Sequence, residues 1–212
     1  MEIVPVLNCL DKDSAEKKLK ILETFLDKKN FVHIDISDGT FANYKNFSDI
    51  EEWKKINIDF PFEVHLMVRN PEELAILWSS FGAKRIILHI ETISKETISE
   101  ILKKIEINGS EIMLAVNPAT SIEMLNEYVE LSKNFLVLAV TPGPAGQEFD
   151  FSVLDKIEFL KKKNAIIIEV DGGINYETAS EVKKVGANTI ASGSFIFNAT
   201  DCKKAFFKLK EI

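Results

Sequence analysis

Cysteine is scarce in this sequence, which has only Cys9 and Cys202 among its 212 residues. So few cysteines exclude a fold stabilised by a set of disulfide bonds, and they are typical of a reducing compartment, so we expect a cytoplasmic location. Long apolar runs are also absent, and no stretch reaches the roughly 20 apolar residues of a membrane helix. Residues 1–5 lack the basic segment that leads into the apolar run of a secretory signal. We therefore expect neither a signal peptide nor a membrane segment.

Positive charge is in deficit as well, because 26 lysines and arginines face 33 aspartates and glutamates, for a net charge of −7. Nucleic-acid binding depends mainly on cationic side chains that contact phosphates, so this balance argues against a nucleic-acid partner. Hydrophobic residues make up 46% of the chain, which excludes a disordered protein. The length suits one domain over residues 1–212, with a core large enough for an enzyme.

Short apolar runs, most of them rich in Ile, Val or Leu, alternate with longer amphipathic stretches along the whole chain. Such runs are typical of strands buried on both faces of a parallel sheet. They are Ile3–Leu7, Phe31–Ile36, Phe62–Leu66, Arg85–Ile90, Glu111–Val116, Phe135–Val140, Ala165–Val170 and Thr189–Ser192. Eight strand–helix repeats in about 200 residues predict an α/β fold of the (β/α)₈ TIM-barrel type. An open doubly wound sheet is the alternative, but no Gly-x-Gly-x-x-Gly follows the first run.

Several residues mark where the intervening helices begin and end. Asn70 before Pro71 predicts an N-cap followed by proline at the first helical position. Thr120, three residues before a glutamate, has the spacing of a capping box. Gly82 and Gly186 each close a helical pattern just before a strand, which indicates left-handed C-caps.

Histidines and aspartates stand at the ends of three predicted strands, where a barrel carries its chemistry. Side chains alternate along a strand, so His33 and Asp35 share one face, and His65 and Asp171 hold comparable positions on the third and seventh strands. If these faces point into the barrel mouth, two imidazoles and two carboxylates converge as ligands for a divalent transition metal. The alternative is that each is an isolated cap or a satisfied polar group. We expect the third histidine, His89, to give structural support rather than to bind the metal.

Glycine-containing turns follow the seventh and eighth predicted strands. Gly172 and Gly173 precede a helix that Asn175 can cap, and Gly193 and Ser194 follow the last strand. Barrels often bind phosphate with the loops after these two strands, through backbone N–H groups. Neither segment contains Lys or Arg, so we expect backbone amides rather than a cation to hold the phosphate.

A loop rich in proline and glycine, residues 141–147, follows the sixth strand. Two prolines and two glycines in so short a stretch give it a defined shape. Such a loop can close over a ligand. The alternative is a plain connector.

Taken in order, these segments resemble the ribulose-phosphate 3-epimerase family, and the resemblance covers nearly the whole chain. The matching motifs are His33–Gly39, Val64–Met67, His89–Glu91, Asn117–Thr120, Pro142–Gln147, Val170–Gly173 and Gly193–Ser194. The resemblance implies a ribulose-phosphate-binding barrel that interconverts D-ribulose 5-phosphate and D-xylulose 5-phosphate. It also implies a homo-oligomer.

The resemblance further implies roles for individual residues. His33, Asp35, His65 and Asp171 would hold one divalent metal ion, which in the family is often zinc, iron, manganese or cobalt. Asp35 and Asp171 would also be the catalytic acid–base pair, since epimerisation removes a proton from one face of a carbon and returns one to the other. The expected substrate-binding residues are Asn8, Met67, Gly143, Gly146, Gln147, Gly172, Gly173, Gly193 and Ser194.

Departures from the family pattern keep alternatives open. Val6 stands where the family usually has a serine that reaches the substrate, although Asn8 lies on the same strand face and can take its place. Ser37 replaces a usual methionine, and the 142–147 loop differs at two positions. An epimerase of a related ketose phosphate, such as a ketohexose 6-phosphate, is therefore an alternative, and a non-catalytic phosphosugar-binding barrel is a weaker one. A sister lyase would need Lys near position 37, which is absent.

Overall fold

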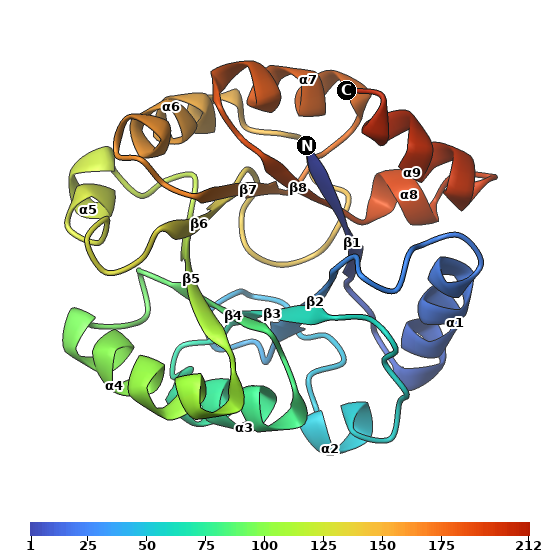
Figure 1. The fold of residues 1–212 in the computed structure, drawn as a ribbon, viewed down its shortest axis with the longest axis horizontal. Helices are drawn as coiled ribbons and strands as arrows, with labels where there is room; N and C mark the ends of the chain where they lie inside the picture. Colours follow the sequence, from blue (N-terminus) through green and yellow to red (C-terminus); the bar gives the residue numbers. More distant parts are fainter.

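Eight parallel strands, paired in chain order and closed by β8 on β1, form a barrel in the computed structural model, which describes residues 1–212 (Figure 1). The strands are β1 Glu2–Leu7, β2 Val32–Ser37, β3 Phe62–Met67, β4 Arg85–His89, β5 Glu111–Val116, β6 Asn134–Leu138, β7 Ile167–Asp171 and β8 Thr189–Ser192. The predicted (β/α)₈ barrel is confirmed, and the open-sheet alternative is wrong. Each predicted strand is present, with its limits shifted by at most two residues.

Helices surround this barrel and cover its outer face (Figure 1). They are α1 Lys12–Glu23, α2 Ile50–Trp53, α3 Glu72–Phe81, α4 Lys95–Ile105, α5 Ile122–Asn126, α6 Leu154–Lys162, α7 Tyr176–Val185, α8 Ser194–Phe197 and α9 Cys202–Lys210. Two short 3₁₀ helices, η1 Glu106–Asn108 and η2 Phe151–Val153, complete the set. None of the helices is both long and apolar enough to cross a membrane. The main core lies between the strands and these helices.

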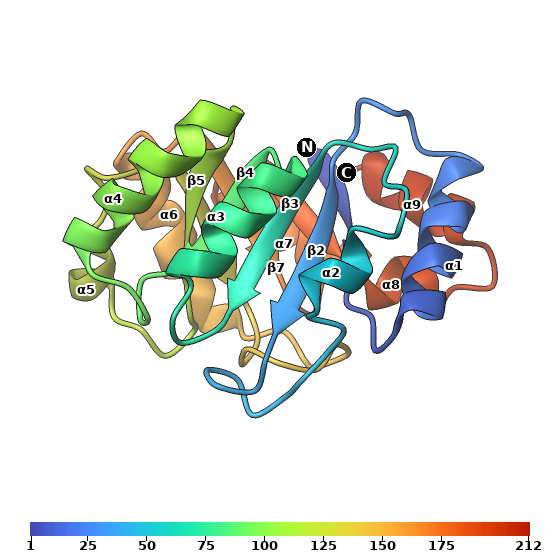
Figure 2. The same cartoon turned by 90° about the horizontal axis from the view of Figure 1, so that it is seen from below.

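The inside of the barrel has an apolar side and a polar side. Strands β4 to β6 supply the apolar side, whose buried residues are Ile87, Met113, Ala115, Leu136 and Leu138. Strands β2, β3 and β7 supply histidines and carboxylates at the interior positions. Figure 2 shows the carboxyl ends of β2 and β3 directed toward the same end of the barrel as the loop after β6. The polar side of the interior therefore opens toward the long loops.

The helix ends follow the predictions in part. Gly82 and Gly186 have φ angles of 111° and 122° and end α3 and α7, as predicted. Asn175 caps α7, accepting hydrogen bonds from two backbone N–H groups of the first turn. Its predicted counterpart Asn70 does not cap α3, because Pro71 is the N-cap and its carbonyl already accepts the first helical hydrogen bond.

The predicted cap at Thr120 is also wrong. Ser121 is the N-cap of α5, and its side chain accepts a hydrogen bond from the Met124 N–H. The Thr120 hydroxyl instead donates to the Glu91 carboxylate at the end of β4. A partner distant in sequence has thus drawn the hydroxyl away from the helix end.

Candidate active site

The carboxyl ends of β2, β3 and β7 bring together the four side chains predicted to bind a metal. One nitrogen or oxygen from each of His33, Asp35, His65 and Asp171 lies within 4.8 Å of the others. Both histidines are fully buried, and Asp35 is only 5% exposed. Strand alternation places His33 and Asp35 on one face, and the parallel register sets Asp35 beside His65.

The two histidine rings are directed at the same carboxylate oxygen. His33 Nε2 lies 3.2 Å from Asp35 Oδ1, and His65 Nδ1 lies 3.1 Å from that atom. Two imidazole nitrogens and two carboxylates are a donor set that suits a divalent transition metal. The four residues could therefore hold such an ion.

The opposite ring nitrogens of both histidines also have buried partners. His33 Nδ1 donates to Glu63 Oε1 over 2.7 Å. His65 Nε2 lies 2.8 Å from His89 Nε2, and His89 Nδ1 lies 3.2 Å from Glu91 Oε2. Metal-binding histidines usually have such partners, which fix the ring and its tautomer. His89 contacts His65 and is not one of the four converging residues, and its supporting role stays a prediction.

The two aspartates have opposite protonation preferences. Burial raises the pKa of Asp35, but hydrogen bonds from His33 and His65 outweigh it and hold that pKa well below its usual range. Burial also raises the pKa of Asp171, and the negative charge of Asp35 adds to the effect, so this pKa reaches about 6. In the metal-free site Asp35 is therefore ionised at neutral pH, whereas Asp171 gains a proton just below it.

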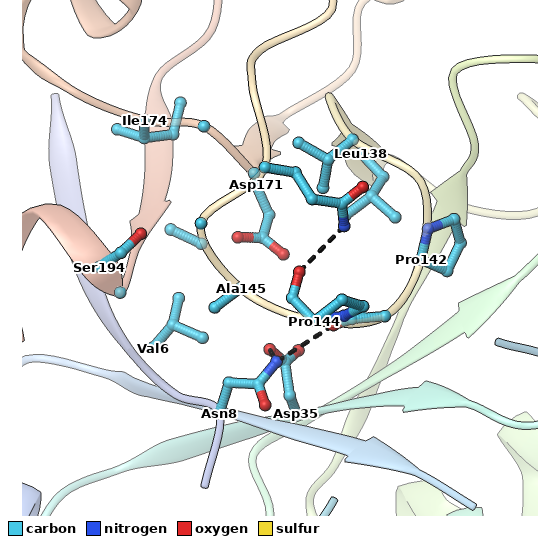
Figure 3. Close-up of a pocket in the computed structure, with 18 of the residues that line it drawn as sticks. Val6, Asn8, Asp35, Leu138, Pro142, Pro144, Ala145, Asp171, Ile174 and Ser194 are labelled. Atoms are coloured by element: carbon cyan, nitrogen blue, oxygen red, sulfur yellow. Dashed lines mark hydrogen bonds between the residues drawn. The ribbon is translucent and has the colours of Figure 1, made fainter. Parts of the chain in front are cut away.

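A cavity of about 280 Å³ opens above these residues. Figure 3 shows Asp35 and Asp171 extending toward each other from opposite sides of it. Every residue expected to bind substrate lines this cavity, namely Asn8, Met67, Gly143, Gly146, Gln147, Gly172, Gly173, Gly193 and Ser194. His33 and His65 do not line it but lie beneath its floor.

Asn8 links the end of the first strand to Asp35 and to the loop after β6. Its Nδ2 donates to Asp35 Oδ2 over 3.0 Å and approaches the Gly143 carbonyl at 3.4 Å. The Tyr44 hydroxyl in turn donates to Asn8 Oδ1. Val6 lines the cavity from the same strand and offers no polar group. Asn8 therefore presents the polar group that β1 brings to the site.

The loop after β6 crosses the cavity, with Pro144 and Ala145 at its turn (Figure 3). Gln147 Nε2 donates to the carbonyls of Thr141 and Pro144, so the loop is closed on itself by its own side chain. The loop after β7 packs against the residues that directly follow this loop. A Cβ on Gly173, whose φ is +64°, would lie 2.7 Å from the backbone nitrogen of Phe149. Only glycine fits there, and the two loops are held together by this close approach.

Lys18 is a residue of this cavity that the sequence did not reveal. It lies on α1 and is the only cationic residue among those lining the cavity. Its Nζ donates to the Asn8 carbonyl over 2.9 Å and lies 4.9 Å from the centre of the Phe197 ring. The glycine loops themselves contain no cation, so the expectation that their backbone amides hold the phosphate stays a prediction, with Lys18 as a further group in the same cavity. Lys18 is distant in sequence from those loops, and nothing in its helical pattern distinguishes it.

A second group of charged residues lies deeper in the barrel than the four candidate metal ligands. Glu63 and Glu169 are fully buried and flank Arg85. Burial raises the pKa of Glu63, but the His33 hydrogen bond and the Arg85 charge lower it to about 2. For Glu169, burial and the charge of Glu63 raise the pKa to about 8. The group therefore contains one carboxylate, one guanidinium and one neutral carboxylic acid at pH 7.

A closed parallel barrel with histidines and aspartates converging at its mouth defines a class of barrel enzyme with a candidate metal centre. Residues 2–197 match the model of the ribulose-phosphate 3 epimerase family. The chain therefore belongs to the ribulose-phosphate 3-epimerase family, and the resemblance drawn from the motifs is confirmed.

Individual relatives agree with this assignment. The chain is 34% identical over 190 residues to ribulose-phosphate 3-epimerase of Chlamydia muridarum, covering 86% of this chain and 80% of that protein. It is 32% identical over 186 residues to ribulose-phosphate 3-epimerase of Bacillus subtilis, covering 84% and 85%. Among solved structures, KGPDC from Streptococcus mutans superimposes with a TM-score of 0.73 at 14% identity, covering 99% of this chain and 95% of that one. At that identity the structural likeness shows the shared barrel fold alone.

Proposed function

We propose that this protein interconverts D-ribulose 5-phosphate and D-xylulose 5-phosphate. Membership of the ribulose-phosphate 3-epimerase family supports this reaction. The observation that carries the proposal is the pair Asp35 and Asp171, which face each other across the cavity within 4.8 Å of the same two histidines. The cytoplasm as the location and a homo-oligomeric assembly remain part of this proposal.

Two opposed carboxyl groups are what an epimerisation requires. The proton on the carbon beside the ketone must leave from one face and a proton must return to the other. Asp35 is ionised, and Asp171, with its raised pKa, is the group of the pair that takes up a proton more readily. Asn8 fixes the orientation of Asp35 through its 3.0 Å hydrogen bond. The loop of residues 142–147 covers the cavity and would exclude water from the enediolate.

A divalent metal ion fits the four converging residues. Their donors are two imidazole nitrogens and two carboxylates, and the far nitrogen of each ring already has a buried partner. When bound by His33, Asp35, His65 and Asp171, a zinc, iron, manganese or cobalt ion would supply Lewis-acid stabilisation of the enediolate charge. The donor set does not choose among these metals.

The phosphate end of the substrate fits the side of the cavity that the loops after β7 and β8 line. Gly172 and Gly193 bring backbone there, and Ser194 brings a hydroxyl. Lys18 adds an ammonium group, which favours a dianionic phosphate in a site otherwise lined by acidic and neutral residues. These groups would orient the sugar with its reacting carbon between the aspartates.

The reaction is tested by incubating metal-loaded protein with D-ribulose 5-phosphate in D₂O. We expect deuterium at the epimerised carbon and formation of D-xylulose 5-phosphate. Protein that binds the sugar phosphate without exchange would instead be the non-catalytic barrel, and the proposal would be wrong. Because Val6 lines the cavity where the family usually has serine, a ketohexose 6-phosphate should be assayed in parallel. A higher kcat/KM for the hexose would favour the alternative epimerase.

A further inference from the structure

Four charged or ionisable residues form one continuous row near the amino ends of strands β2 to β5. The strand register sets His33 beside Glu63, Glu63 beside Arg85, and Arg85 beside Glu111. Glu169, on β7, approaches the same row from across the interior. The row thus begins at a residue of the candidate metal site and ends near the opposite mouth of the barrel.

Hydrogen bonds join each member of this row to the next. His33 Nδ1 donates to Glu63 Oε1 over 2.7 Å, and Arg85 Nη1 donates to Glu63 Oε2 over 2.5 Å. Arg85 Nε donates to Glu111 Oε1 over 2.9 Å, where the Glu111 side chain is 50% exposed. Glu63 therefore uses one oxygen for the histidine and the other for the arginine, and both contacts are buried.

Such a row adds little stability to the interior of a barrel. A buried ion pair often contributes no more stability than well-packed apolar residues of the same volume. The other side of this interior is filled by apolar residues such as Ile87 and Leu136. Glu169 is fully buried and forms no hydrogen bond with either carboxylate oxygen. A purely structural role does not explain why this side of the interior carries charged residues.

We propose that Glu63 is a positioning residue for the metal ligand His33, and that Arg85 holds Glu63 in place. By accepting the Nδ1 proton, Glu63 leaves Nε2 of His33 as the nitrogen that faces Asp35. Arg85 donates to the second oxygen of Glu63 and so fixes the orientation of the carboxylate that faces His33. This inference depends on the proposed metal site, because the benefit of a fixed ring orientation is realised when His33 binds the ion.

The proposal is tested with Glu63→Gln, Arg85→Met and the double variant, with Glu111→Gln as the matched control. Glu111 also contacts Arg85 but lies at the exposed end and does not reach His33. Zinc affinity is measured by competition with a chromogenic chelator, independently of turnover. We expect Glu63→Gln to weaken zinc binding about 10- to 100-fold, as loss of a ligand's hydrogen-bond partner does. Glu111→Gln should stay within about twofold of the wild type by the same reasoning.

Histidine nitrogen NMR separates positioning from general stability. The chain has three histidines, so His33 is readily assigned in zinc-loaded, ¹⁵N-histidine-labelled protein. Wild-type His33 should carry its proton on Nδ1, and Glu63→Gln should broaden or shift that signal. If Glu63→Gln folds poorly, the double variant removes both charges together and should regain its fold while its zinc affinity stays low.

The outcomes separate this inference from the proposed function. Wild-type protein that binds no divalent ion would overturn the metal site and this inference together. Wild-type protein that binds zinc, with Glu63→Gln binding equally tightly and an unchanged His33 signal, would overturn the positioning role alone. Weakened binding in Glu63→Gln and in the double variant, with Glu111→Gln unaffected, would support it.

Discussion

At the scale of single residues, the surroundings of Asp35 and Asp171 make them chemically different although both are aspartates. Asp35 accepts one hydrogen bond from Asn8 and faces both histidine rings, which stabilise its ionised form. Asp171 lies near the negative charge of Asp35 with fewer donors, and its pKa is raised to about 6. Pairs of carboxyl groups whose pKa values are separated by their surroundings are how acid and base roles are divided at neutral pH.

Replacing Asp171 with asparagine should remove turnover and solvent exchange while leaving the barrel folded. The amide has the shape of the carboxyl group but cannot accept and return a proton, and general acid–base groups contribute about 10²- to 10⁴-fold in rate. The D171N variant is assayed in D₂O beside the wild type, with circular dichroism as the control for folding. Exchange at the wild-type rate would remove Asp171 from the mechanism.

His89 gives the fold a sensitivity to acid. Burial lowers its pKa to about 4, below the usual value of 6.5, so the unfolded chain binds a proton more readily than the folded one between these values. Stability from this group is present above pH 6.5 and is lost as the pH falls toward 4. Between pH 7 and pH 5 the loss should be roughly 2 kcal/mol.

Urea unfolding of metal-free protein at pH 7 and pH 5 measures this effect. His89→Gln retains a polar side chain without the titration, so its stability should fall less between the two pH values than that of the wild type. Equal losses in both proteins would mean that His89 does not titrate as its burial requires.

The sequence indicates some of these residues and hides others for a physical reason. His33, Asp35 and His65 could be predicted because strand alternation and parallel pairing alone bring their side chains to one face. The position of Lys18 depends on how α1 packs against the closed barrel, and the pairing of Glu63 with Arg85 depends on the register of β3 and β4. The spacing of residues along the sequence predicts none of these features.

At the scale of elements, the loops after β6 and β7 form one unit at the mouth of the barrel. Gly172 would place a Cβ 2.5 Å from a methyl group of Val140, and Gly173 would place one against the backbone of Phe149. A side-chain methyl can shift, but a backbone segment moves only if its whole loop moves. The position of the 142–147 loop therefore depends on the absence of a side chain at Gly173.

Gly173→Ala should displace the loop and weaken substrate binding. The added Cβ meets backbone atoms at 2.7 and 2.8 Å, and alanine also disfavours the φ of +64°. We expect KM for the sugar phosphate to rise roughly tenfold or more, which corresponds to about 1.4 kcal/mol. Gly146→Ala is the matched control, because its φ is +86° but nothing lies within 4 Å of the added carbon. If both variants raise KM equally, the contact with Phe149 has no role in loop position.

The local sequence determines the strands and some of the helix ends. The strands could be predicted because β-branched runs punctuated by glycine and proline recur with regular spacing, and Gly82 ends α3 for reasons contained in its own backbone. The start of α5 could not, because Thr120 donates to Glu91, a residue of another strand's end. Element order is thus a local property of this sequence, whereas the choice of cap is set by tertiary contacts.

At the scale of the whole molecule, the barrel brings four potential metal-binding side chains together in one place. Asp35, Asp171 and the two histidines lie together at the carboxyl ends of strands from both halves of the chain, β2 and β3 from one and β7 from the other. A cation bound there contacts both halves at once. It would therefore stabilise the closed barrel and not the unfolded chain, in which these residues are far apart.

Metal binding should raise the melting temperature, and a chelator should reverse the rise. A ligand present at 100 times its Kd stabilises the folded state by about 2.7 kcal/mol. For a chain of this length that corresponds to roughly 5 to 10 °C. The measurement is thermal unfolding with and without zinc, for the wild type and for Asp35→Asn, which removes the carboxylate that both rings face. Asp59→Asn, which changes an exposed carboxylate paired with Lys28, is the matched control and should keep the full rise. A rise of equal size in Asp35→Asn would show that the ion binds elsewhere on the barrel.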